Sequence, residues 1–105
     1  IGFARGAGTN LTDYATRTGI DGVGLDAGVA PSWAASQLPA GLCLQGNLDP
    51  VLIGVGGAAM DDAALAILAA WESRSFIFNL GHGIVPQTPP EHVAKLVELV
   101  RRGAA

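Results

Sequence analysis

Four times along the chain, a short apolar segment typical of a β-strand is followed by a segment typical of a helix. The strands are expected to begin near residues 1, 22, 42 and 75. This alternation predicts right-handed crossovers and a parallel sheet with helices outside it. Because no antiparallel edge strand is expected and the glycine-rich loops gather at one end, half of a (β/α)8 barrel fits better than a doubly wound sheet.

A complete barrel of this kind needs roughly 250 residues. The chain has 105 residues, of which half are apolar and 14% are charged, so its composition is that of a core-forming sequence. We therefore predict one α/β domain over residues 1–105, built from four βα units of a partial TIM barrel.

The fourth unit has the clearest boundaries. Phe76–Phe78 is a continuous apolar run, which predicts a strand buried on both faces of the sheet. Thr88 is expected to cap the following helix, with Pro89 at its first position and Glu91 closing a capping box. Gly103 supplies the expected stop.

His82 lies between Gly81 and Gly83, directly after the predicted strand. A polar side chain at the carboxyl end of a parallel strand faces the crevice where α/β proteins bind ligands. The two glycines permit positive φ and leave the backbone uncluttered, so a bulky ligand could approach the imidazole. The alternative is that the glycines only turn the chain and that His82 is a half-buried polar residue, as most single histidines are.

Three further polar residues are expected near the carboxyl ends of earlier strands. Arg5 precedes a glycine-rich loop that resembles a weak anion site. Asp26 either faces a ligand or caps the next turn, and the two readings are equally supported. Asn47, like Asp49, is expected in a loop over residues 46–50, where bonding to loop amides is favoured over substrate contact.

Residues 54–59 match the glycine spacing of a dinucleotide-binding fingerprint. The motif requires a preceding strand, and the turn at Asp49-Pro50 leaves only Val51–Ile53 for it. We therefore interpret residues 54–59 as a loop before a helix.

Charge and cysteine content exclude several classes. The net charge of −3 argues against a nucleic-acid partner. Cys43 is the only cysteine, so the chain has no internal disulfide and no thiolate metal cluster. Without a signal sequence or an apolar run long enough to span a membrane, a soluble, cytoplasmic protein is expected.

Several segments, in order, resemble the C-terminal part of the uroporphyrinogen decarboxylase family, and the most specific are Gln45–Pro50 and Asn79–Gly83. The others are Gly2–Gly8, Val23–Asp26 and Pro89–Val93. The resemblance implies the C-terminal half of a (β/α)8 barrel, usually a homodimer, that decarboxylates the four acetates of uroporphyrinogen III to give coproporphyrinogen III. It implies no metal and no organic cofactor.

In this family the histidine matching His82 lines the cleft and contacts the tetrapyrrole. The aspartate that meets the pyrrole N–H groups, the main arginine, a tyrosine and a hydroxyl residue lie in the N-terminal part, so Asp26 and Asp49 are not that aspartate. We expect His82 to bind and orient substrate, with proton transfer second, and Gly81, Gly83, Arg5, Asp26 and Asn47 to line the cleft. His92 is expected on the surface.

Two other functions remain open. A corrinoid or methionine-type methyltransferase of a related barrel would use zinc held by histidine and cysteines, and the isolated Cys43 weighs against it. A non-catalytic tetrapyrrole-binding fragment is the other, because most of the family's functional residues are absent here. The open edges of a half barrel also predict self-association.

Overall fold

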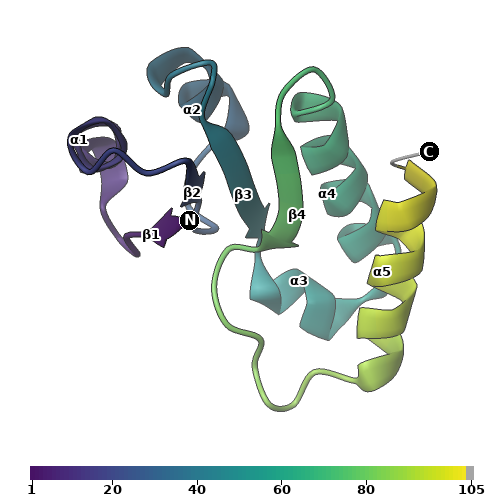
Figure 1. Cartoon of the computed structure of the whole chain (residues 1–105). Coiled ribbons are helices and arrows are strands. Elements are labelled where there is room, and N and C mark those ends of the chain that lie inside the picture. Colours follow the sequence, from purple (N-terminus) through teal and green to yellow (C-terminus); the bar gives the residue numbers. More distant parts are fainter. Residues whose placement is uncertain (104–105) are drawn as a thin grey trace.

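The computed structural model describes residues 1–103, which form one parallel sheet whose strands are ordered β1-β2-β3-β4 (Figure 1). The strands are β1 (Gly2–Phe3), β2 (Gly22–Gly24), β3 (Cys43–Leu48) and β4 (Phe76–Leu80). Each strand pairs in parallel with the one before it. The predicted parallel sheet with intervening helices is confirmed, and its sequential order is the one that a segment of a barrel wall requires.

The helices follow the strands in alternation. They are η1 (Gly8–Asn10, a 3-10 turn), α1 (Leu11–Arg17), α2 (Pro31–Gln37), α3 (Pro50–Val55), α4 (Gly57–Ala70) and α5 (Pro90–Gly103). Pro31 opens α2 at the position where a missing N–H costs nothing. Among residues 1–103, no helix combines the length and the apolar character that crossing a bilayer requires.

Helix α3 was not predicted. The Asp49 carboxylate accepts a hydrogen bond from the Val51 amide at 3.0 Å, and Pro50 takes the first helical position, so residues 50–55 become helical. Gly56, at φ +69°, ends α3, and α4 begins at the next residue. The expected loop over residues 54–59 is therefore wrong, and no strand precedes the glycine pattern that resembled a dinucleotide fingerprint.

Strand β3 extends into the loop predicted over residues 46–50. Asn47 and Leu48 pair with residues 79 and 80 of β4, so residues 46–48 belong to the sheet and not to a loop. Strand β2 ends at Gly24, which leaves Asp26 in the loop beyond it.

Helices α4 and α5 cover one face of the sheet beside β3 and β4, and they also contact each other (Figure 1). The buried side chains between these layers include Leu44, Leu48, Met60 and Trp71. The opposite face is open, because Ile77 keeps 45% of its surface exposed there. The prediction that β4 is buried on both faces is therefore wrong for residues 1–103, whose four strands do not enclose the face opposite the helices.

The predicted capping box of α5 does not form. The Thr88 hydroxyl has no hydrogen-bond partner among the described residues, and the helix begins at Pro90. The His92 amide donates instead to the Pro89 carbonyl at 3.0 Å, which occupies a first-turn donor without a side-chain cap.

Candidate functional site

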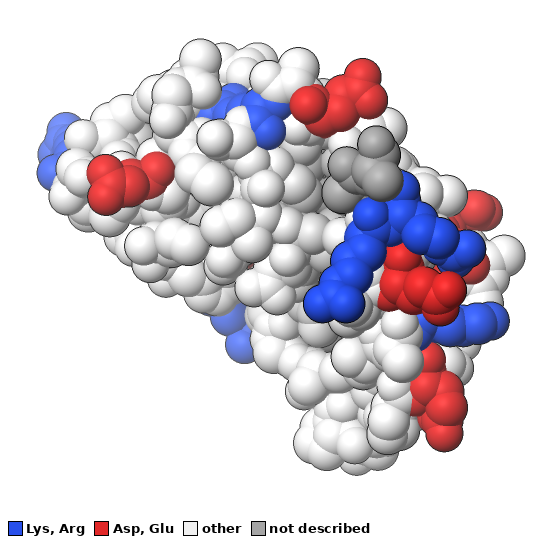
Figure 2. Space-filling view, turned by 45° about the vertical axis from the view of Figure 1, so that its right-hand side comes forward, with Lys and Arg blue, Asp and Glu red and all other residues white. Residues whose placement is uncertain are grey.

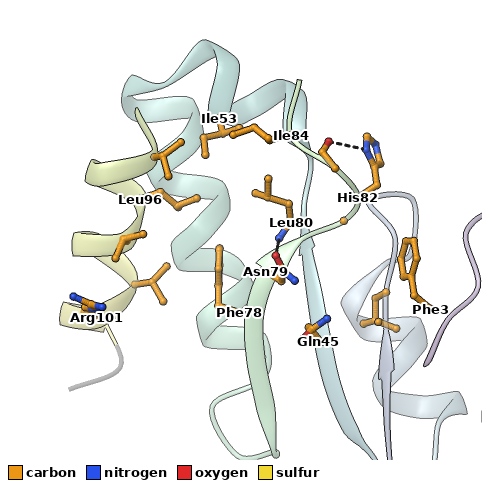
Figure 3. Close-up of a pocket in the computed structure, with 17 residues that line it drawn as sticks. Phe3, Gln45, Ile53, Phe78, Asn79, Leu80, His82, Ile84, Leu96 and Arg101 are labelled. Atoms are coloured by element: carbon orange, nitrogen blue, oxygen red, sulfur yellow. Dashed lines mark hydrogen bonds between the residues drawn. The ribbon is translucent and has the colours of Figure 1, made fainter. Parts of the chain in front are cut away.

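A cleft of about 780 Å³ runs along β4, between α5 on one side and the open face of the sheet on the other (Figure 3). Its apolar wall is formed by side chains of β4, α3, α5 and the loop after β4. These are Ile53, Phe78, Leu80, Ile84, Val93, Leu96, Val97 and Val100. Polar groups enter it at Gln45, Asn79, His82 and Arg101.

His82 lies two residues after β4 ends, at the carboxyl end of the sheet, and its half-buried ring lines the cleft. Its Nδ1 lies 3.3 Å from the Gly83 carbonyl oxygen, the one contact of the ring within hydrogen-bonding range in the described chain (Figure 3). When Nδ1 carries a proton, it donates to this carbonyl, and Nε2 is then left for a ligand. In the neutral ring this Nε2 can accept a hydrogen bond or a proton. In the charged ring it donates a hydrogen bond.

The two glycines beside His82 differ in their surroundings. A Cβ on Gly81 would lie 2.6 Å from the Ala27 Cα, so Gly81 is required by close backbone packing. The Gly81 amide also donates to the Leu48 carbonyl at 2.8 Å. Gly83 faces open space, and neither glycine adopts a positive φ. Both glycines line this cleft, where they serve close packing and access and not the positive φ that the sequence analysis allowed for.

Asp26 does not line the cleft. Its carboxylate accepts a hydrogen bond from the Gly6 amide at 2.7 Å, while its carbonyl accepts one from the Val29 amide. The side chain therefore joins the loop after β2 to the loop after β1, instead of facing the cleft or capping its own turn.

Asn47 is buried, with 5% of its surface exposed, and it does not line this cleft. Its Nδ2 donates to the carbonyls of Asp26 at 3.0 Å and Val29 at 2.7 Å. It therefore shapes a loop, as favoured from the sequence, but through carbonyls and not through amides. Arg5 is exposed and lies outside the lining of this cleft.

His92 is half-buried and not a surface residue as predicted. Its Nδ1 lies 2.7 Å from the Ile53 carbonyl oxygen of α3. A Cβ on Gly56 would lie 2.6 Å from its Cε1, so the ring covers the glycine between α3 and α4. His92 therefore holds the start of α5 against α3.

Sequence reasoning missed Gln45, Asn79 and Phe3 as cleft residues. Strand alternation was the available signal: Gln45 pairs with Ile77, and Ile77 and Asn79 are the exposed positions of β4. Reading Phe76–Phe78 as doubly buried concealed that alternation.

No group of three or more metal-ligating side chains occurs within residues 1–103. Cys43 is a free thiol at the start of β3, whereas His82 follows the end of the parallel strand β4. The two therefore lie toward opposite ends of the sheet. The cleft offers amide donors, an imidazole and one guanidinium against apolar walls, which suits an organic ligand that carries carboxylates.

Comparisons with known proteins identify the family of the chain. A family model described as uroporphyrinogen decarboxylase (URO-D) matches residues 1–103. A uroporphyrinogen decarboxylase of Sphingopyxis alaskensis is 56% identical over 103 residues, and those of Granulibacter bethesdensis and Rhodospirillum rubrum are 54% and 52% identical over 101 residues. These matches cover 96–98% of the chain but only 29–30% of each relative. The chain spans less than a third of the length of these relatives, and it belongs to the uroporphyrinogen decarboxylase family.

Proposed function

We propose that the chain supplies the last four βα units of a (β/α)8 uroporphyrinogen decarboxylase. The complete enzyme would remove carbon dioxide from the four acetates of uroporphyrinogen III and release coproporphyrinogen III. The observation that carries the proposal is the position of His82, which follows the last strand and lines a cleft of about 780 Å³. Ligand sites for organic molecules commonly have volumes of ~300–1,000 Å³.

Decarboxylation of an acetate side chain requires a group that accepts the electron pair left behind by carbon dioxide. Protonation of a pyrrole ring makes it cationic, and the electron pair left when carbon dioxide departs then neutralises that ring. A carboxylate near the pyrrole N–H groups stabilises the cation, and hydrogen-bond donors position the acidic side chains. The resemblance places that carboxylate and the main arginine in the part of the relatives that precedes this chain.

His82 would bind and orient an acetate or a propionate, with proton transfer as its second role. The Gly83 carbonyl next to Nδ1 favours the ring orientation that directs Nε2 to a ligand. A charged imidazole gives a charge-assisted hydrogen bond to a carboxylate, which is about twice as strong as a neutral one.

The methyltransferase alternative is not favoured. A zinc site of that kind needs histidine and cysteine ligands within ~2.0–2.3 Å of one metal ion. Cys43 and His82 lie toward opposite ends of a parallel sheet and do not meet that requirement. A non-catalytic tetrapyrrole-binding fragment remains the second candidate, because the cleft is present while the family's remaining functional residues are not.

A chimera tests the function. The chain would replace the matching 103 residues of the Sphingopyxis alaskensis relative, to which it is 56% identical. We expect the chimera to decarboxylate uroporphyrinogen and His82→Ala to lower kcat/KM by at least ~10-fold, because a hydrogen bond to a charged group is lost. His92→Asn is the matched control, since it alters a histidine that contacts α3 and does not line the cleft.

Each possible failure has a separate meaning. A folded chimera without decarboxylase activity would contradict the proposed function. An active chimera that is indifferent to His82→Ala would contradict the role of His82 alone.

We also propose that the isolated chain self-associates through its open sheet edges. Parallel pairing with β3 leaves the N–H and C=O groups of alternate β4 residues, among them Phe76 and Phe78, directed away from β3. Phe3, Ile77 and Ile84 are exposed by 45–47%, and Figure 2 shows a broad, largely uncharged surface beside the clustered charges. Light scattering at micromolar concentration should detect dimers or larger species, and a stable monomer would contradict this.

A further inference from the structure

Two asparagines are paired across β3 and β4, and within residues 1–103 only Asn47 uses its side-chain donor inside the fold. Asn47 pairs with Asn79 in the sheet register. Asn47 is buried and spends its Nδ2 group on two loop carbonyls. Asn79 is exposed and lines the cleft that His82 also lines (Figure 3).

Within residues 1–103, one hydrogen bond orients the side-chain amide of Asn79. Its Oδ1 accepts a hydrogen bond from the Leu80 amide at 2.8 Å. A backbone N–H can only donate, so the atom facing it must be the oxygen, which assigns Nδ2 to the other side. Within residues 1–103 that Nδ2 group donates to no acceptor, so its two protons are available to a ligand.

We propose that Asn79 is a second carboxylate-binding residue of the cleft, acting beside His82 on a different carboxylate of the same tetrapyrrole or on the same one. The inference deepens the proposed function and rests on it. Because the Oδ1 of this amide is already occupied, the side chain can offer a ligand only its Nδ2 donors. It therefore favours ligand groups that accept hydrogen bonds over groups that donate them. The acceptors that uroporphyrinogen offers are its acetate and propionate carboxylates.

The residues around Asn79 leave its amide accessible to a ligand. Phe78 and Leu80, its neighbours in β4, point to the other face of the strand, whereas Asn79 is on the exposed face. His82 follows three residues later on the same chain segment. Gln45, on the adjacent strand, brings the only other side-chain amide to the cleft lining within the described residues.

The test uses Asn79→Asp in the full-length chimera. The aspartate keeps an oxygen for the Leu80 amide, removes the two donors and adds a negative charge. We expect KM for uroporphyrinogen to rise by at least ~10-fold, because a hydrogen bond to a charged group is lost. The thermal midpoint should stay unchanged. Added salt should recover part of the loss, because it screens the repulsion between the new carboxylate and the substrate.

Gln87→Glu is the matched control. It makes the same amide-to-acid change on an exposed residue of the loop after β4 that does not line the cleft. Its KM and its salt dependence should match those of the unmodified chimera. A residue with only a structural role would instead lower the thermal midpoint of Asn79→Asp and leave KM unaffected by salt.

Equilibrium binding of the oxidised octacarboxylate, uroporphyrin, separates this inference from the proposed function. If the chimera shows no turnover but binds uroporphyrin, and Asn79→Asp weakens that binding, the result would support the carboxylate site and contradict the decarboxylase function. Turnover and binding that change less than twofold in Asn79→Asp would overturn the inference and leave the proposed function standing.

Discussion

Gly81→Ala tests whether the cleft depends on the close contact between the loops after β2 and β4. The new Cβ would lie 2.6 Å from the Ala27 Cα, whereas ordinary contact begins near 3.4 Å. The obstructing atoms belong to the backbone, so no side chain can swing away. The two segments must therefore separate by most of an ångström.

The expected cost has two parts. Overpacking of this kind costs about 1–3 kcal/mol, and strain on the 2.8 Å bond from the Gly81 amide to the Leu48 carbonyl adds up to about 1 kcal/mol. His82 is the next residue, and a displacement of ~1 Å at a reacting group can lower activity by ~100-fold. We expect Gly81→Ala to lose both stability and kcat/KM in the chimera.

Urea titration followed by circular dichroism measures the stability, and a decarboxylation assay measures kcat/KM. Gly83→Ala is the control for stability, because nothing lies within 4 Å of its new Cβ and the change should stay within about 0.5 kcal/mol. A Gly81→Ala chimera that is as stable and as active as the parent would refute the reasoning.

Two further substitutions probe contacts that hold the loops and helices near the cleft. Asn47→Leu removes the donor shared by the Asp26 and Val29 carbonyls. Because buried acceptors are left unpaired, the free energy of unfolding measured by urea titration should fall by about 1–3 kcal/mol. A change below about 0.5 kcal/mol, the scale of a surface substitution, would contradict this role of Asn47. Gly56→Ala should lower the free energy of unfolding by a similar ~1–3 kcal/mol, because φ is +69° and the His92 ring blocks the new methyl group. Adding His92→Ala should recover part of that loss in a double-mutant cycle, and strictly additive effects would show that the ring is not the obstacle.

The sheet was predictable because its strands are short apolar runs separated by helical segments. Helix α3 was not, because the same Asp49-Pro50 pair that reads as a turn also supplies an N-cap and a first helical residue. The choice between these readings depends on where β3 ends. That end is set by pairing with β4, which is not a local property of the sequence.

The candidate site was likewise predictable only in part. His82 was predictable from its place after a strand and between glycines. The roles of Asp26 and Asn47 were not, because their partners lie 18 to 21 residues away in other loops. Contacts between residues so far apart in the sequence depend on how one βα unit packs on the next.

The segment from Asp26 to Val29 contacts three other parts of the chain. It meets Gly6, after β1, through a carboxylate, Asn47, near the end of β3, through two carbonyls, and Gly81, after β4, through backbone packing. One short stretch thus joins the loops after β1, β2 and β4 to the end of β3, so these loops are expected to open together and not independently. Amide exchange should therefore slow or quicken together across these loops.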